Sequence, residues 1–308
     1  MLHPTKDAAK PPKAADAFDA VDVGDTPLAC TRRGAGEPLV LVHGSNSDLR
    51  TWLPVLPGLG RAYRVCAYSR RHHWPNAPIA AGQDYAMAGQ IDDLEAIVDR
   101  LQAAPARLIG HSYGALLCLQ LALRTPQRVR SLVLVEPPAL TLFTSARPTP
   151  PQLLRLLAKR PRLALAIVRL GAFGMAPAEA ALRRGDSEAA LQRVGSAVLG
   201  ARAYRMLSPE RLAQARANMI GAELLGSGML PIDAARLRQL ACPTLLLCGA
   251  NSPRLFHHLS AALAQWLPRA RQAVVPAASH LVHEDNPQGW LDAVLDFLAE
   301  RPPPALSR

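Results

Sequence analysis

The 308-residue chain has few cysteines, few aromatic residues and no long apolar run. An odd number of scattered cysteines without metal-site spacing argues against a disulfide framework and favours reduced thiols. These are Cys30, Cys66, Cys118, Cys242 and Cys248. No stretch of 18 uninterrupted apolar residues occurs, which argues against a membrane span. The polar segment Met1 to Asp16 lacks the apolar centre of a secretory signal, so we expect a cytoplasmic protein.

Acidic residues are also scarce, with 24 Asp and Glu against 35 Lys and Arg and a net charge of +11. Most of the excess falls between residues 141 and 240, where 15 basic residues face 6 acidic ones. These basic residues are dispersed along helical patterns, without interleaved aromatic residues or a nucleic-acid motif. We therefore expect no nucleic-acid partner and no stable membrane association. A site for an acidic substrate remains open.

An apolar content of 49% is sufficient for a large core, and short apolar segments alternate with helical patterns. Clear helical periodicity occurs at Tyr85–Leu101 and Asn286–Ala299. This alternation is typical of α/β proteins with a parallel sheet. The expected strands are Phe18–Val23, Leu28–Arg32, Pro38–Val42, Arg64–Tyr68, Ala106–Ile109, Ser131–Val135, Thr244–Cys248 and Gln272–Val275.

Residues 139–240 interrupt the alternation, because they contain helical segments punctuated by proline and glycine and no clear strand. We expect a helical lid there, inserted into an α/β core formed by residues 18–138 and 241–300. Residues 1–17 are expected to be a disordered lead-in, and residues 301–308 a loose tail.

The most informative motif is Gly110-His111-Ser112-Tyr113-Gly114, between an expected strand and a helical pattern. A Gly-x-Ser-x-Gly sequence in this context predicts a nucleophile elbow, a turn so sharp that the serine adopts a strained backbone conformation. The flanking glycines remove collisions with the strand and the helix. Ser112 is therefore the candidate nucleophile.

A second motif, His43-Gly44-Ser45, follows the apolar strand Leu39–Val42. An acyl-transfer enzyme needs backbone N–H groups fixed where the oxyanion develops. The amides of Ser45 and Tyr113 are the candidates for this oxyanion hole.

Ser112 also needs a general base, since a serine hydroxyl is a weak nucleophile at neutral pH. His280 lies just after the last expected strand and before the last helix, in a loop that returns to the edge of the sheet where Ser112 emerges. His283 is the second candidate. His111 is expected to pack, and the pairs at 72–73 and 257–258 lack the third ligand of a metal site, so we expect no metal.

These motifs resemble the α/β-hydrolase superfamily over residues 25–138 and 241–298. The resemblance implies an α/β-hydrolase fold, a mostly parallel eight-stranded sheet with helices on both faces and an inserted helical lid. In most members the catalytic acid is an aspartate shortly after the strand that corresponds to Thr244–Cys248. Here that turn carries Asn251, and no Asp or Glu occurs from Ala234 to His283.

Some members of the superfamily place the acid at the end of the preceding strand, where this chain has Glu136 before two prolines. Glu136 is therefore the candidate third member of the triad, which would hold the imidazole in the correct tautomer. Glu284 and Asp285 remain less favoured alternatives, because they lie close to His280 in sequence.

The substrate pocket is expected to involve His43, Gly44, Trp52, Arg70 and Phe143. Arg70 or its neighbour Arg71 can meet an acidic group of the substrate, although a loop arginine is usually solvated or paired.

A serine nucleophile implies an acyl-enzyme, and therefore a carboxylic ester or lactone as a small-molecule substrate. No metal or organic cofactor is needed. Acyl transfer to another acceptor, hydrolysis of a carbon–carbon bond in a diketone-like substrate, and a non-catalytic ligand-binding role remain alternatives. The oligomeric state stays open.

Overall fold

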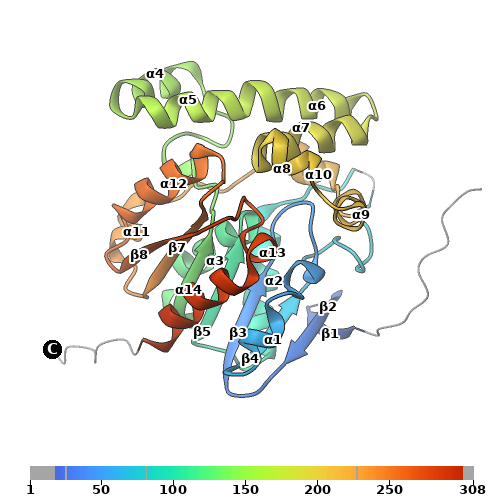
Figure 1. The fold of residues 1–308 in the computed structure, drawn as a ribbon, viewed down its shortest axis with the longest axis vertical. Helices are drawn as coiled ribbons and strands as arrows, with labels where there is room; N and C mark the ends of the chain where they lie inside the picture. Colours follow the sequence, from blue (N-terminus) through green and yellow to red (C-terminus); the bar gives the residue numbers. More distant parts are fainter. Residues whose placement is uncertain (1–17, 25, 81, 227, 301–308) are drawn as a thin grey trace, which may run out of the picture.

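One eight-stranded sheet organises the computed structural model, which describes residues 18–24, 26–80, 82–226 and 228–300 (Figure 1). The strand order is β1-β2-β4-β3-β5-β6-β7-β8, with β1 and β2 antiparallel to their neighbours and all other pairs parallel. The strands are β1 (Asp19–Val23), β2 (Thr26–Arg33), β3 (Glu37–Val42), β4 (Tyr63–Tyr68), β5 (Ala106–His111), β6 (Val129–Val135), β7 (Thr244–Gly249) and β8 (Ala270–Val275). The prediction of a mostly parallel eight-stranded sheet is confirmed. The expected lead-in and tail, residues 1–17 and 301–308, lie outside the described residues.

Both faces of the sheet are buried under helices, as the continuous apolar runs of the central strands predict. Alternate residues of β3 point to opposite faces. Val40 and Val42 pack in the core beneath α2 (Met87–Arg100) and α3 (Tyr113–Arg124). Leu39 and Leu41 pack in a second core with α1 (Leu56–Leu59) and α14 (Pro287–Ala299). The remaining core elements are η1 (Leu49–Trp52), η2 (Pro126–Arg128), α12 (Arg254–Ala264) and α13 (Val282–Asp285).

Residues 139–240, here named the helical insert, follow β6, and their helices between residues 150 and 225 form a layer above one end of the sheet (Figure 1). The last helix of the insert lies lower, beside the sheet, where Leu237 packs in the main core. Leu156, Leu163 and Ile167 of the insert pack against Leu255 and Leu259 of α12. The insert contains η3 (Leu140–Leu142), α4 (Pro150–Lys159), α5 (Pro161–Leu170), the π-helical turn η4 (Gly171–Met175), α6 (Ala176–Arg183), α7 (Ser187–Leu199), α8 (Ala201–Arg205), α9 (Pro209–Ala217), α10 (Gly221–Leu225) and α11 (Ala234–Gln239).

Polar contacts also join α9 to loops of the core. Gln214 and Asn218 donate hydrogen bonds to the buried Asp48 carboxylate at 2.9 and 2.7 Å. Arg211 pairs with Glu284 at 3.0 Å. The insert is therefore held to the core by charged groups as well as by apolar packing.

The run from α5 to α6 (Pro161–Arg183) is long and apolar enough to cross a membrane by length and composition, with a mean hydropathy of 1.4. Only 28% of its most apolar window is buried. Core helices of other proteins meet the same criteria, so this match alone does not define a membrane-spanning segment.

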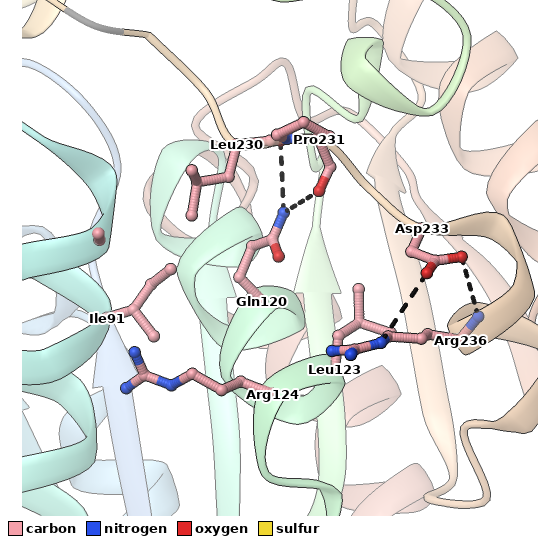
Figure 2. A pocket seen from close by; sticks show the side chains of 9 residues that line it. Ile91, Gln120, Leu123, Arg124, Leu230, Pro231, Asp233 and Arg236 are labelled. Carbon is pink, nitrogen blue, oxygen red and sulfur yellow. Dashed lines mark hydrogen bonds and ion pairs between the residues drawn. The ribbon is translucent and has the colours of Figure 1, made fainter.

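A small pocket of about 260 Å³ marks where the chain leaves the insert and returns to the core (Figure 2). Gln120 of α3 points upward in this view and donates to the carbonyl oxygens of Leu230 and Pro231, at 3.4 and 3.0 Å. Arg236 pairs with Asp233, and Arg124 with Asp92. Because the polar side chains around this pocket bond to their neighbours, we infer that they hold the returning chain against α3.

Two glycines in the first turns of helices provide a matched test of the elbow. A Cβ on Gly114 would collide with the carbonyl oxygens of Val42 and His43, whereas a Cβ on Gly89 of α2 would meet nothing within 4 Å. We expect Gly114→Ala to lower the free energy of unfolding by about 2–3 kcal/mol. Gly89→Ala should raise it by up to about 1 kcal/mol. Urea denaturation measures both, and equal effects would contradict the close packing of α3 on β3.

Candidate active site

Ser112 sits at the junction of β5 and α3, in the strained conformation that the elbow motif predicts. Its backbone angles are φ 51° and ψ −118°, a region that non-glycine residues adopt rarely and at a cost of roughly 1–3 kcal/mol. The Ser112 N–H donates to the carbonyl oxygen of Val135 on β6 at 2.8 Å. A Cβ on Gly44 would lie 3.0 Å from Ser112 Cβ, so the loop after β3 approaches the serine closely.

A short hydrogen bond joins His280 and Glu136, which are 144 residues apart in the chain. His280 Nδ1 lies 2.5 Å from Glu136 Oε2, and both side chains are almost fully buried. The second carboxylate oxygen accepts from the N–H of Gly249 at 2.8 Å. Because a carboxylate only accepts, Nδ1 carries the proton, and Nε2 presents a lone pair. This is the tautomer that a general base requires.

The alternative histidine has other partners. His283 is fully buried, its ring stacks on Trp52 at 4.3 Å, and its Nε2 lies 2.8 Å from Thr51 Oγ1. Burial lowers the pKa of His283 to about 3, with further lowering by Arg211 and His280. A ring held in this way is unsuited to exchange protons with a serine near neutral pH.

The two alternative acids also bond elsewhere. Glu284 accepts from Thr51 and pairs with Arg211. Asp285 accepts from the backbone N–H and the hydroxyl of Ser279, at 2.7 and 2.5 Å. Neither carboxylate is the partner of His280, which leaves Glu136 as the acid that the geometry favours.

His111 contacts the candidate base through the backbone. Its Nε2 donates to the carbonyl oxygen of His280 at 2.9 Å, and the two rings lie 4.8 Å apart. The Phe256 ring also stacks on the His280 ring, at 4.2 Å. Sequence reasoning gave His111 only a packing role and missed this bond, because its acceptor is 169 residues away.

Ser112 Oγ and His280 are not joined by a hydrogen bond in the described part of the chain. Catalytic hydrogen bonds are often long in ligand-free proteins and tighten when substrate binds. The structure therefore brings the candidate base His280 and the candidate acid Glu136 together, and it places Ser112 in the elbow between β5 and α3.

The two candidate oxyanion amides make no hydrogen bond among the residues that the structure describes. Ser45 is exposed at the end of the loop after β3, and Tyr113 is the first residue of α3, where an N–H has no partner within the helix. Both amides are thus available to an oxygen atom of a ligand.

Arg70 is buried and paired within the protein, which differs from the sequence expectation of a residue exposed in the substrate pocket. Its side chain is fully buried, with Nε donating to His43 O at 3.1 Å and Nη2 to Gly44 O at 3.0 Å. Nη1 donates to Tyr85 at 2.7 Å, and Nη2 pairs with Glu223 of α10 at 2.9 Å. A guanidinium occupied in this way cannot meet an acidic substrate; it fixes the loop that carries the Ser45 amide.

Three other residues that were expected in the substrate pocket pack against other parts of the protein. His43 is fully buried and donates through Nδ1 to Gly44 O at 2.8 Å, while its Nε2 accepts from the Arg70 N–H. Trp52 is fully buried in the core that contains Trp290. Phe143 packs at the edge of the α4–α5 apolar cluster. Gly44, by contrast, lies close to Ser112, since a Cβ added to it would be 3.0 Å from Ser112 Cβ.

Comparison with known proteins identifies the family. Residues 37–287 match the family described as alpha/beta hydrolase fold. The chain therefore belongs to the alpha/beta hydrolase family and is an enzyme of that class.

Individual relatives cover most of the chain. The magnesium-chelatase 30 kDa subunit of Rhodobacter capsulatus is 30% identical over 268 residues, which is 85% of this chain and 87% of that protein. The 2-hydroxymuconate semialdehyde hydrolase of a Pseudomonas species is 28% identical, with 89% and 91% covered. An alpha/beta hydrolase structure from Sphaerobacter thermophilus gives a TM-score of 0.68 at 26% identity, with 91% and 100% covered.

The buried Arg70–Glu223 pair has a matched surface counterpart in Arg124–Asp92, whose side chains are 37% and 67% exposed. We expect Arg70→Met to lower the free energy of unfolding by about 3–5 kcal/mol, since it leaves Glu223 and two carbonyl oxygens without their donor. Arg124→Met should cost less than about 1 kcal/mol. Urea denaturation measures both variants, and similar losses in the free energy of unfolding would contradict a stabilising role of the buried Arg70–Glu223 pair.

Because some histidines are buried in the neutral form, we expect the folded protein to lose stability as the pH falls. Burial, together with the Arg70 charge, lowers the pKa of His43 to about 3, and the pKa of His283 is likewise about 3. Between pH values of about 6.5 and 3, the unfolded chain binds protons at these rings that the folded chain does not. Each ring should therefore lower the free energy of unfolding by about 1.4 kcal/mol per pH unit as the pH falls below about 6.5.

The measurement is urea denaturation at several pH values between about 4 and 7. His283→Gln should make the pH dependence shallower by the contribution of one ring. An unchanged slope would show that protonation of His283 is not what destabilises the fold in acid.

Proposed function

We propose that the chain is a serine hydrolase that cleaves a carboxylic ester or lactone through an acyl-enzyme on Ser112. The observation that carries the proposal is the 2.5 Å contact between His280 Nδ1 and Glu136, beside the strained elbow. Burying a carboxylate in such a pair carries a desolvation penalty, which supports a specific role for the pair. The complete nucleophile, base and acid also favour an enzyme over a ligand-binding protein.

The reaction proceeds in two stages. As Ser112 Oγ attacks the substrate carbonyl carbon, His280 Nε2 accepts the hydroxyl proton, and Glu136 stabilises the resulting imidazolium. The N–H groups of Ser45 and Tyr113 donate to the oxyanion. His280 then returns the proton to the leaving alcohol oxygen, and the acyl-enzyme forms. A water molecule attacks this ester in the second stage, with His280 again as the base, which releases the acid and restores Ser112.

The helical insert acts in this proposal as the lid that limits access of water to the acyl-enzyme. Its contacts with Arg70 and Asp48 support a position over the carboxyl ends of β3 and β4. We further propose that the enzyme is cytoplasmic, takes small-molecule substrates and needs no cofactor.

A second candidate is hydrolysis of a carbon–carbon bond by the same residues. The relative named 2-hydroxymuconate semialdehyde hydrolase, similar over 89% of this chain, favours it. Rates on a panel of nitrophenyl esters and lactones, compared with those on a diketone-like substrate, separate the two. Product analysis with added alcohols distinguishes hydrolysis from acyl transfer.

The decisive experiment uses a fluorophosphonate probe followed by peptide mass analysis. We expect one adduct on Ser112 and none in Ser112→Ala. Glu136→Gln should lower kcat on a nitrophenyl ester by about 10⁴-fold with the fold retained, because the wrong tautomer becomes favoured. Asn251→Ala is the control. Asn251 is exposed, and its backbone N–H, which donates to Ala278 O, is kept in the variant, so removal of the side chain should change kcat only slightly. Absence of an adduct on Ser112 would favour the ligand-binding alternative.

A further inference from the structure

A large cleft lies between the helical insert and the start of α12, and the catalytic proposal does not use it. Its volume is about 830 Å³, which falls in the range of small-molecule sites. Its walls come from α5, η4, α7 and the first turns of α12, and Ser112, His280 and Glu136 are not among the lining residues.

Four arginines converge on this cleft. They are Arg162, Arg169, Arg193 and Arg254, and no aspartate or glutamate is among the residues that line it. Within the described residues, none of the four forms an ion pair or a side-chain hydrogen bond, as some other arginines do: Arg71, Arg107 and Arg216 have carboxylate partners. Clustered unpaired positive charges repel one another, and an anion would relieve that repulsion.

The side chain of His258 is exposed to the same positive charge. Its ring lines the cleft, and its pKa is lowered by burial and then by the charges of Arg162 and Arg254. Burial and the charges of the two arginines therefore both disfavour a further proton on this ring.

The lining of the cleft is also apolar in part. Leu165, Leu170, Phe173 and Leu255 line it, and Leu165 and Phe173 are 56% and 71% exposed, so apolar surface of the insert meets solvent beside the arginines. Arg162, Leu165 and Arg169 lie three to four residues apart along α5, which places charge and apolar surface on one face. A small inorganic anion would leave this apolar surface uncovered.

We propose that the cleft binds a free amphiphilic carboxylate, whose aliphatic chain packs on Phe173 and the leucines while its carboxylate pairs with the arginines. Guanidinium groups bind carboxylates through paired, charge-assisted hydrogen bonds. The hollow shape favours a discrete molecule over a flat lipid surface. This proposal does not rest on the role of Ser112.

The test is isothermal titration of the wild-type protein with decanoate, a carboxylate that an esterase does not consume. We expect saturable binding that acetate and decyltrimethylammonium do not reproduce, because the first lacks the chain and the second reverses the charge. Arg169→Gln/Arg254→Gln should weaken decanoate binding at least about tenfold, as expected for the loss of two charge-assisted contacts. The His258 pKa, followed by NMR, should rise when decanoate binds.

The matched control is Arg183→Gln/Arg202→Gln, which removes two exposed arginines of the insert that do not line the cleft. It should bind decanoate as the wild type does. Equal binding of decyltrimethylammonium, or equal weakening in both double variants, would overturn the proposal. So would binding to phosphatidylglycerol vesicles without binding to free decanoate, which would assign the surface to a membrane instead.

Discussion

The arrangement of the candidate active site depends on one hydrogen bond between a buried carboxylate and a buried imidazole. Glu136 loses its hydration on burial, and an unpaired carboxylate there would be strongly destabilising. His280 and the Gly249 N–H compensate for this loss from two different elements. The order of β6, β7 and β8 in the sheet brings these partners together, since the residues after each strand meet at the same edge. The sheet topology is therefore a requirement of the pair, and His111 and Phe256 then fix the ring on its other sides.

Arg70 is a second buried charged group, and it holds the backbone of the loop after β3 in place. Its guanidinium donates to the carbonyl oxygens of His43 and Gly44, so the loop that carries the Ser45 amide is fixed before any substrate arrives. Preorganised donors avoid the reorganisation that water would require as charge develops. The charge is balanced by Glu223 from the insert, which makes the geometry of the candidate oxyanion hole dependent on a helix more than 150 residues away.

The sequence predicted the strands, and it pointed to candidate residues wherever the local pattern was informative. Eight apolar segments became eight strands, and the absence of any carboxylate from Ala234 to His283 directed attention to Glu136, now found against His280. The surroundings of Arg70 and Trp52 could not be predicted in this way. A loop arginine is usually solvated, and nothing near Arg70 in the chain indicates Glu223, because their contact depends on how the insert folds over β4. Trp52 precedes a loop as a pocket residue would, yet its ring belongs to the core with Trp290.

The insert is bound to the core through two buried ionic groups, and this limits how freely such a layer can be exchanged in evolution. Asp48 receives hydrogen bonds from Gln214 and Asn218, and Arg70 receives its counter-charge from Glu223. A chimera that carried another family member's helices on this core would leave a carboxylate and a guanidinium stranded at the junction. Grafting substrate preference between such enzymes therefore requires residues 48 and 70 to be transplanted together with the helices that match them.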